Sequence, residues 1–529
     1  MNNLVLITGA LLMAATASAN AGTLVTPDEI ARRDAWVEAS FERLAPAPTP
    51  PGLMVFANND PVIKNYRHGK PLNLAGTHYT NGLYCHAVSK VEVRLPGPAK
   101  TFTAVAGVDS NEQTSGGRGS VVFSVSVGHQ EKFQSQLLRE GMTGVPVKVD
   151  LNGATSFLLE IGDGGDGIAC DQSDWANARV TLTDGKELWL ADLPFVESTI
   201  HGLPFSFVYD GRASSELLSK WQRTQQTKTL DASRSERTIT WTEPQTGLVL
   251  RCVVVQYATF PTVEWTLYFK NSGAQDSPIL SNILALDTTF MRGQQGEFLL
   301  HHHAGSTATM DDYRPYETPL PPKANLRLTS AGGRGSDGCW PYFNLDWGNA
   351  GTIVVVGWPG QWSASFTRDG GCGLHLQAGQ EQTRFKLLPG EEVRSPLTVL
   401  QFWQGDWIQA QNVWRRWMIA HNLPRLNGKV PPPLLPGGSS NQMNEMQNAN
   451  EENQKQFIDG YLGNRVPISF WWMDAGWYPF KEGWWNTGTW EPDSKRFPNG
   501  LRAVTDHAHQ RGVNALVWFE PERVQPGTW

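Results

Sequence analysis

The sequence has no long run of basic residues. Its 44 Lys and Arg are outnumbered by 51 Asp and Glu, so the formal net charge is −7 at pH 7 and the pI is near 6.0. A protein that follows the phosphates of a nucleic acid needs a strongly basic surface. The composition therefore argues against a nucleic-acid partner.

Cysteine is also scarce. Five cysteines occur in 529 residues, at Cys85, Cys170, Cys252, Cys339 and Cys372. Because the number is odd, at least one thiol stays unpaired unless it pairs between chains. The domain boundaries expected below allow disulfides between Cys85 and Cys170 and between Cys339 and Cys372.

Long apolar runs are absent beyond the N-terminus, so we expect no membrane span. At the N-terminus, the apolar stretch Leu4–Ala17 is followed by small residues up to Gly22, and no Lys or Arg precedes it. The apolar stretch and its small-residue end are typical of a secretory signal peptide, here residues 1–21. We therefore expect a secreted or periplasmic protein, in which disulfides are permitted.

Glycine, proline and tryptophan are abundant, with 52 Gly, 34 Pro and 22 Trp against 11 Tyr. Glycine and proline mark the turns of a protein rich in β-strands. Tryptophan offers a flat apolar face, which suits either a core or the face of a sugar ring. The chain length favours about three domains.

Patterns along the chain define four segments after residue 21. Residues 22–60 contain a predicted helix and a proline-rich linker. Residues 61–194 alternate short strands with Gly, Asn and Asp turns, which predicts a β-sandwich, and residues 195–400 predict a second and larger one. In residues 401–429, Trp407, Ala410, Trp414 and Trp417 recur at helical spacing, which predicts a linker helix.

Residues 430–529 change to an alternation of strand and helix. Short apolar runs at Leu434–Leu435, Ile468–Met473 and Val513–Phe519 predict strands, and helices are expected after Asn450 and near Asn499. This alternation is how a (β/α)₈ barrel begins, but such a barrel needs about 250 residues. The sequence therefore predicts an incomplete barrel.

Polar residues follow two of the predicted barrel strands. Asp474 follows the second strand within Trp472–Trp477, and Trp518–Arg523 ends the third. The βα loops of a barrel converge at this edge, where active sites form. A carboxylate there can accept hydrogen bonds from sugar hydroxyls while an indole covers the apolar face of the sugar. The alternative is that the tryptophans are core residues and the acids lie in solvated loops.

These motifs resemble α-galactosidases of glycoside hydrolase family 36, within clan D. The resemblance is carried by Asp474–Trp477, a Gly-x-Trp loop ending at Trp490, Phe497–Leu501 and Trp518–Glu522, in this order. Upstream, Phe260–Tyr268 resembles the N-terminal super-sandwich of that family. The resemblance implies a fold of super-sandwich followed by a (β/α)₈ barrel.

It further implies a retaining hydrolase of terminal α-galactosides that needs no cofactor. The implied substrate-binding residues are Asp474, Trp477, Trp490, Trp518, Glu522 and Arg523. Ala475 stands where the family has a second aspartate, which puts strict galactose selectivity in question.

The resemblance also implies where the catalytic pair belongs. The nucleophile and the acid/base, about 5–5.5 Å apart in retaining enzymes, lie on later strands of the family's barrel. We therefore expect both beyond Trp529, so no catalytic residue is assigned and this chain is expected to be inactive alone.

The first sandwich resembles the NPCBM module, a jelly roll related to family 51 carbohydrate-binding modules. Gly82–Ala87, Ala106–Asp109 and Asp174–Ala178 carry this resemblance. We consider His86 and Trp175 as sugar contacts, with a core or hinge role as the alternative.

Two further clusters suggest metals. Asp163, Asp166 and Asp171 offer oxygens to a structural Ca²⁺, but their spacing is not that of an EF-hand, so a solvated turn is the alternative. The run His301–His303 has no carboxylates at ligand spacing, which favours a loop or a strand end.

The expected partner is a carbohydrate, namely an α-galactoside in an oligo- or polysaccharide. Two alternatives stay open: a clan-D hydrolase of another α-glycoside such as an α-N-acetylgalactosaminide, and a non-catalytic carbohydrate-binding protein with a vestigial barrel. Homo-oligomer formation is also left open.

Overall fold

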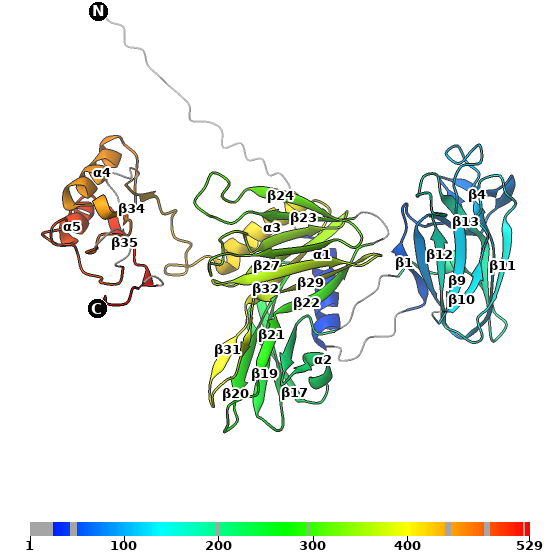
Figure 1. Cartoon of the computed structure of the whole chain (residues 1–529), viewed down its shortest axis with the longest axis horizontal. Helices are drawn as coiled ribbons and strands as arrows, with labels where there is room; N and C mark the ends of the chain where they lie inside the picture. The colour runs from blue at the N-terminus through cyan, green and yellow to red at the C-terminus, as the bar shows by residue number, and fades with distance from the viewer. Residues whose placement is uncertain are drawn as a thin grey trace, which may run out of the picture. The chain divides into compact units, whose positions relative to one another are not determined.

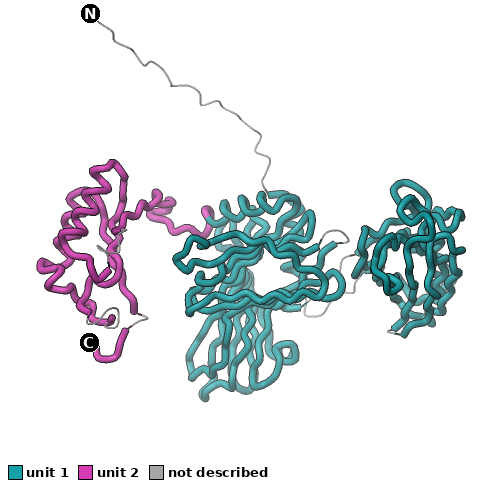
Figure 2. Tube along the Cα trace, turned by 45° about the horizontal axis from the view of Figure 1, so that its top comes forward, with its two compact units in different colours: residues 1–418 teal, residues 419–529 magenta. Residues whose placement is uncertain are grey.

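The computed structural model describes residues 25–42, 50–128, 130–196, 202–293, 297–439, 446–480, 487–521 and 524–528. The expected signal peptide, residues 1–21, lies outside the described residues, and so does Trp529. The chain divides into two compact units, residues 1–418 and 419–529 (Figure 2). In the described part of the chain, no helix is long and apolar enough to cross a membrane.

The first domain is a β-sandwich (Figure 1). Its main strands are β1 (Gly52–Ala57), β2 (Ile63–Lys64), β6 (Gly82–His86), β7 (Ser89–Arg94), β8 (Ala99–Val108), β9 (Val122–Val127), β10 (Gln130–Gln134), β11 (Val145–Asp150), β12 (Ser156–Gly162), β13 (Gln172–Leu182) and β14 (Glu187–Trp189). They form sheets in the orders β1-β7-β12-β9-β10 and β11-β8-β13-β6-β2, and β14 pairs with β13. A small sheet joins β3 (Tyr66–Arg67), β4 (Lys70–Leu74) and β5 (Thr77–Tyr79).

The core of this sandwich follows from the period of two in its strands. On β7, Val91 and Val93 are buried while the intervening residues are partly exposed. Both pair with residues of β12, Val91 with Leu159 and Val93 with Phe157, which are buried as well. Since β1 already belongs to this sheet, the domain begins at Gly52, before the expected boundary at residue 61.

Helix α1 (Pro27–Val37) is present as predicted, and it packs on the second sandwich. Thr26 caps it through a capping box with Glu29. The ring of Trp36 lies 5.7 Å from that of Trp265. The buried Arg33 guanidinium donates to three backbone carbonyls at 2.6–3.1 Å, those of Tyr257, Phe260 and Thr262. The first sandwich is therefore inserted in sequence between α1 and the strands that α1 covers.

The second sandwich contains one large sheet and two smaller ones. The large sheet has the order β17-β18-β19-β20-β32-β27-β26-β23-β24, and β31 pairs with β20. Its strands are β17 (Gln222–Asp231), β18 (Arg234–Thr242), β19 (Leu248–Tyr257), β20 (Thr262–Asn271), β23 (Phe298–His303), β24 (Pro315–Leu320), β26 (Tyr342–Asp346), β27 (Ala350–Gly357), β31 (Glu392–Arg394) and β32 (Leu397–Gln404).

The two smaller sheets have the orders β16-β15-β21-β30 and β22-β29-β28-β25. Their strands are β15 (Ser206–Tyr209), β16 (Arg212–Ala213), β21 (Leu280–Leu284), β22 (Leu286–Met291), β25 (Asn325–Thr329), β28 (Trp362–Arg368), β29 (Gly373–Gln380) and β30 (Arg384–Phe385), with the short helix α2 (Ser214–Leu217) after β16. One hydrophobic cluster joins buried side chains of all three sheets, such as Trp265, Leu280 and Leu376.

Two expectations for this region are confirmed. The linker helix is α3 (Trp407–Trp417), and the three histidines end β23. Neither of the two disulfides that the domain boundaries allow is present, and all five cysteines are free thiols. Cys85 is enclosed in the first core, where burial raises its pKa to about 12, and Cys170 lies outside that core. The thiol of Cys339 donates to the His303 carbonyl at 3.5 Å.

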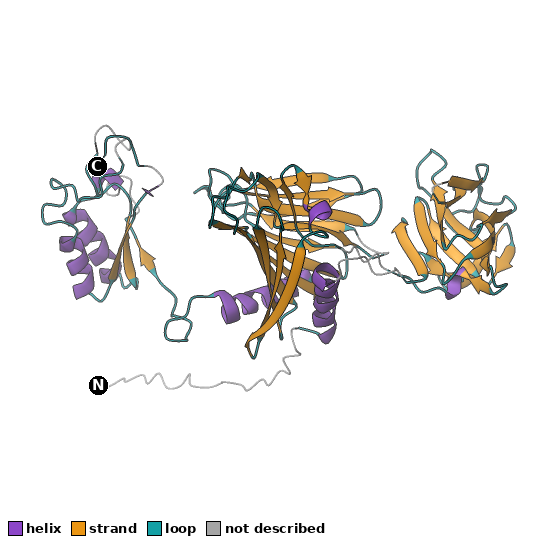
Figure 3. Cartoon of the chain, turned by 90° about the horizontal axis from the view of Figure 1, so that it is seen from below, coloured by secondary structure: helices purple, strands orange, loops and turns teal. Residues whose placement is uncertain are grey.

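The second unit contains a parallel sheet, β33 (Pro436–Gly437), β34 (Phe470–Met473) and β35 (Asn514–Val517). Helices α4 (Glu451–Gly463) and α5 (Arg502–Gln510) lie together on one side of it (Figure 3). Asn450 caps α4 by accepting from two backbone amides. This is the strand–helix alternation of a (β/α)₈ barrel, and the described residues do not form a closed barrel.

One predicted detail of this unit, the first strand, is wrong by a few residues, and the second helix begins near Asn499 as predicted. The first strand is Pro436–Gly437, because these residues pair with Phe470 and Trp471, while Leu434 and Leu435 remain exposed. The N-cap of α5 is Leu501. Asn499 instead donates its backbone N–H to a Glu451 carboxylate oxygen at 2.6 Å.

Candidate functional site

The parallel pairing of β34 and β35 brings the two predicted clusters to one edge of the sheet. Met473 pairs with Val517, so Asp474 and Trp518 follow neighbouring strands at the same end. The Trp518 N–H donates to the Met473 carbonyl at 3.2 Å. This edge is where the active site of a barrel forms.

The two faces of the sheet differ in burial. On the helix side, Trp471 is fully buried, and its indole N–H donates to Gln454 of α4 at 3.1 Å. On the other side, Trp472, Leu516 and Trp518 are 41%, 41% and 42% exposed. The face that would line the inside of a barrel is therefore open and apolar.

Two indoles lie together on this open face. The rings of Trp472 and Trp518 are 6.0 Å apart with an interplanar angle of 37°. Asp474 is the first residue after β34, and its carboxylate accepts a hydrogen bond from the Ala475 amide at 2.7 Å. A half-buried carboxylate beside two exposed indoles can bind the hydroxyls and the apolar face of one sugar ring. Sequence reasoning did not single out Trp472, although the alternation of side chains along a strand could have indicated it.

Trp477 and Trp490 belong to the support of this edge. Trp477 is only 2% exposed, and its indole N–H donates to the Trp518 carbonyl at 2.8 Å. The ring of Trp490 lies 5.0 Å from Tyr478 and 5.4 Å from Phe519. These contacts fix the backbone that carries Trp518. A direct contact of Trp477 or Trp490 with a sugar stays a prediction.

A buried acid lies behind the same edge. Glu520 is 7% exposed and accepts a hydrogen bond of 2.8 Å from the Tyr478 hydroxyl. Burial and the Glu520 carboxylate raise the pKa of Tyr478 to about 12, so this hydroxyl stays a donor. Ala475 is 3% exposed, so an aspartate at this position would be desolvated.

Some of the predicted site lies outside the described residues. These are Glu522 and Arg523. The nucleophile and the acid/base are expected beyond Trp529. Their place on later strands therefore stays a prediction.

The first sandwich contains a separate cavity of about 530 Å³. Its lining includes His86, which is 5% exposed and has Nδ1 2.6 Å from the amide nitrogen of Asn59. Burial is the main cause that lowers the pKa of His86, so its ring is neutral near neutral pH. The other lining residues are Asp60, Glu112, Gln113, Arg118, Ile168, Ala169, Cys170 and Gln172.

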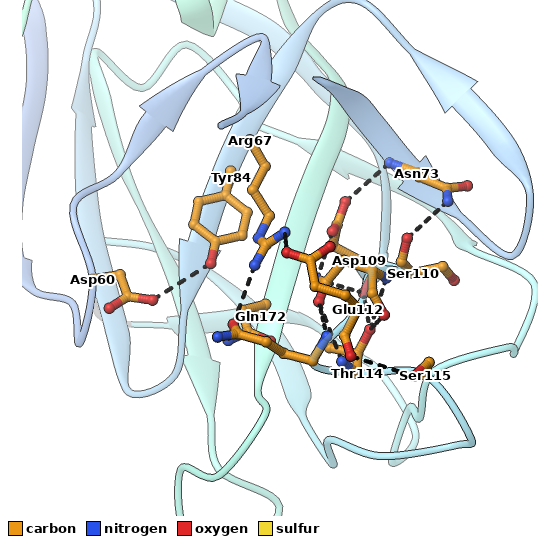
Figure 4. Close-up of polar contacts among 12 residues, drawn as sticks. Asp60, Arg67, Asn73, Tyr84, Asp109, Ser110, Glu112, Thr114, Ser115 and Gln172 are labelled. Atoms are coloured by element: carbon orange, nitrogen blue, oxygen red, sulfur yellow. Dashed lines mark hydrogen bonds and ion pairs between the residues drawn. The ribbon is translucent and has the colours of Figure 1, made fainter. Parts of the chain in front are cut away.

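A polar network fixes one wall of this cavity (Figure 4). The buried Arg67 donates to Glu112 at 3.0 Å and to Gln113 at 3.1 Å. Gln172 donates to the same Gln113 oxygen at 2.7 Å. These residues come from distant parts of the chain, and no sequence spacing indicated them.

The remaining sequence-predicted residues of this domain have structural surroundings. Trp175 is 1% exposed in the core, with its ring 4.8 Å from Phe123, which agrees with the core alternative. Asp171 is buried and accepts from the Ser120 amide at 2.7 Å, while Asp166 pairs with Arg139 at 3.5 Å. Within the described segments, no group of three His, Cys, Asp or Glu side chains is arranged to hold a metal ion. The structural Ca²⁺ near Asp163 stays a prediction.

Comparison with known families finds matches for two segments of the chain. Residues 50–181 match the NPCBM/NEW2 domain, and residues 430–527 match the TIM-barrel domain of glycosyl hydrolases family 31. The chain thus contains a carbohydrate-binding type of β-sandwich and a barrel segment of the glycoside hydrolase type.

Comparison with individual proteins gives two curated relatives. A Renibacterium salmoninarum protein described as an endo-α-N-acetylgalactosaminidase is 30% identical over 31% of this chain and 12% of its own length. The α-galactosidase Mel36A of Lactobacillus acidophilus is 25% identical over 28% of this chain and 20% of its own length. The matched regions therefore span only a small part of either relative.

Among solved structures, the family 36 α-galactosidase AgaA of Geobacillus stearothermophilus superposes with a TM-score of 0.50 at 15% identity. The match covers 62% of this chain and 47% of that chain. At this identity the likeness is one of fold alone.

Proposed function

We propose that the protein is a secreted retaining glycoside hydrolase that removes terminal α-galactosyl residues from oligo- or polysaccharides. The observation that carries this proposal is the carboxyl edge of β34 and β35, where Asp474 and Trp518 follow paired strands at the same end and the rings of Trp472 and Trp518 lie 6.0 Å apart. The barrel-domain match over residues 430–527 supports a hydrolase.

In this proposal the edge binds the sugar that is released. Asp474 accepts hydrogen bonds from sugar hydroxyls, which are worth about 1.5–3 kcal/mol each when the acceptor is charged. Trp472 and Trp518 cover the apolar face of the ring. The Tyr478–Glu520 pair and the Trp477 hydrogen bond to the Trp518 carbonyl position this edge.

The catalytic carboxylates belong, in this proposal, to strands that follow β35. Retention requires a nucleophile and an acid/base about 5–5.5 Å apart across the glycosidic bond. Neither role is given to Glu520, because its carboxylate is buried and accepts from Tyr478.

A second substrate, the α-N-acetylgalactosaminide, is favoured by one observation. The curated relative that is 30% identical to part of this chain is described as an endo-α-N-acetylgalactosaminidase. Ala475 also replaces the second aspartate that the family 36 resemblance predicts, which puts strict selectivity for galactose in question. The test therefore compares the two substrates directly.

The test is hydrolysis of p-nitrophenyl α-galactoside, α-N-acetylgalactosaminide and α-glucoside by the protein carrying the whole barrel. We expect the galactoside to have the highest kcat/KM and the product to keep the α configuration. A higher kcat/KM for the α-N-acetylgalactosaminide would select the second substrate. No turnover of any of the three would overturn the hydrolase proposal.

The NPCBM-type domain is proposed to hold the enzyme on galactose-containing glycans through the cavity beside His86. Calorimetric titration of galactose into the protein and its His86→Ala variant tests this role. Equal binding by the two would place the sugar elsewhere.

A further inference from the structure

The second sandwich contains an aromatic pocket that is separate from the barrel segment and from the NPCBM-type domain. It has a volume of about 430 Å³ and is lined by four aromatic residues, Tyr313, Trp340, Tyr342 and Trp414. Helix α3, which carries Trp414, packs on β27 and β32 (Figure 1). This volume lies within the range of about 300–1,000 Å³ that is usual for small-molecule sites.

Exposed rings form the rim of the pocket. Tyr313 is 50% exposed and Trp340 is 36% exposed, and their rings meet edge to face at 5.2 Å. Deeper in the pocket, the ring of Tyr342 meets that of Trp414 at 5.6 Å. Flat rings at right angles offer one apolar face and one edge to the same ligand.

The backbone at Tyr313 is in an unfavourable conformation. Its φ is +59°, in the left-handed region that a bulky side chain rarely adopts. Holding a non-glycine residue there costs of order 1–3 kcal/mol and is frequent at ligand sites. The Tyr313 ring is half exposed. Burial of this ring in a core therefore does not offset the cost of the backbone conformation.

The polar groups of the pocket are His303, Gln411 and Arg415. Nδ1 of His303 is buried and has no hydrogen-bond partner among the described residues. Arg415 is exposed and donates to the Asn412 side chain at 2.9 Å. Among the residues that line the pocket, Arg415 is the one with a full charge, and it is already engaged. These groups suit a ligand with hydroxyl groups and no charge.

We propose that this pocket is a binding site for a neutral pyranose unit of an oligosaccharide, with Trp340 and Tyr313 covering the sugar ring. Gln411 bonds its hydroxyls at the rim of the pocket. The site is independent of hydrolysis by the barrel and of binding by the NPCBM-type domain. It gives the protein a third contact with a long glycan, beside the barrel edge and the NPCBM-type cavity.

The test is site-resolved hydrogen exchange of the full chain, with D-galactose and stachyose as probes. We expect both sugars to slow exchange in residues 303–313 and 338–342 in a saturable way. Trp340→Ala removes a rim ring and should weaken the apparent affinity at these residues by about fivefold to thirtyfold. Tyr316→Ala is the matched control, because Tyr316 is 41% exposed in the same sandwich and does not line the pocket.

A second variant separates binding from stability. Asparagine tolerates the left-handed region, so Tyr313→Asn removes the ring and relieves the backbone. We expect its melting temperature to be equal or higher and its affinity at residues 303–313 to fall by the same factor. Unchanged exchange in both segments at saturating sugar would overturn the proposal, as would an unaltered affinity in folded Trp340→Ala and Tyr313→Asn. Hydrolysis is not a readout here, so failure leaves the proposed enzyme function untouched.

Discussion

Asp474 is the residue on which the proposed hydrolase depends most. Asp474→Asn keeps the shape of the side chain and removes its charge. From the energy of charged hydrogen bonds, we expect kcat/KM on an α-galactoside to fall by roughly tenfold to a few hundredfold, with folding nearly unchanged. Steady-state kinetics on the protein with the whole barrel measures this. Asp506→Asn, at an exposed position of α5, is the control. An unaltered kcat/KM in Asp474→Asn would remove Asp474 from the sugar site.

Asp174 gives the NPCBM-type domain a pH-dependent stability. It is 0% exposed, and neither carboxylate oxygen has a hydrogen-bond partner within the described part of the chain. Burial and the neighbouring Asp109 raise its pKa well above the usual range. The native state therefore keeps a proton that the unfolded state releases. Between the pKa of Asp174 in the unfolded chain and its higher pKa in the folded domain, the folded state binds more protons than the unfolded state. The free energy of unfolding therefore falls as the pH rises through this range.

Asp174→Asn removes this ionisation and offers an N–H to Asp109. We expect it to stabilise the domain at pH 7 by about 1–3 kcal/mol, the cost of an unpaired buried group. The gain should shrink as the pH approaches 3. Thermal unfolding between pH 3 and pH 7 measures the stability gain of the variant and its direction of change with pH. Asp150→Asn, at an exposed position, is the control. A gain that is the same at all pH values would contradict it.

Among the elements, α1 is a structural part of the second sandwich. Trp36→Ala removes a ring that packs against Trp265 and Phe402 at 5.7 and 5.6 Å. We expect it to destabilise the second sandwich by about 2–4 kcal/mol, as for large core truncations. Denaturant unfolding followed by domain-specific hydrogen exchange should show no change in the NPCBM-type domain. Asp28→Ala, exposed in the first turn of α1, should have little effect.

The elements themselves could be predicted where their pattern is local. Alternation on β7, the Asn450 cap and the apolar run of β34 each depend on neighbouring residues, and each prediction is confirmed. The place where α1 packs and the wall formed by Arg67 and Gln172 depend on contacts between distant segments. No local pattern encodes such contacts. For the same reason, the sequence indicated Asp474 and Trp518 but not the network around His86.

For the whole molecule, the division into cores predicts a separable domain. The NPCBM-type sandwich has its own buried cluster, which includes Trp175, Phe102 and Val93, distinct from that of the second sandwich. We expect residues 50–196 to fold alone with a single cooperative transition and to bind galactose weakly. Calorimetry on this fragment checks both. A fragment without a cooperative transition would mean that the domain depends on the rest of the chain.

Unlike the NPCBM-type domain, the barrel segment is not expected to form a closed core of its own. Its three strands leave Trp472, Leu516 and Trp518 more than two-fifths exposed on one face, whereas a closed barrel would bury the inner side of every strand. A parallel sheet is ordinarily covered on both faces. We therefore expect the 529-residue chain to bind a hydrophobic dye at this face and to release no p-nitrophenol from p-nitrophenyl α-galactoside. Trp472→Ser should reduce dye binding, and Tyr316→Ser, in the second sandwich and outside its aromatic pocket, is the control for loss of an exposed aromatic ring. Measurable turnover by this chain would show that a catalytic pair exists within it, and the assignment of that pair to strands after β35 would be wrong.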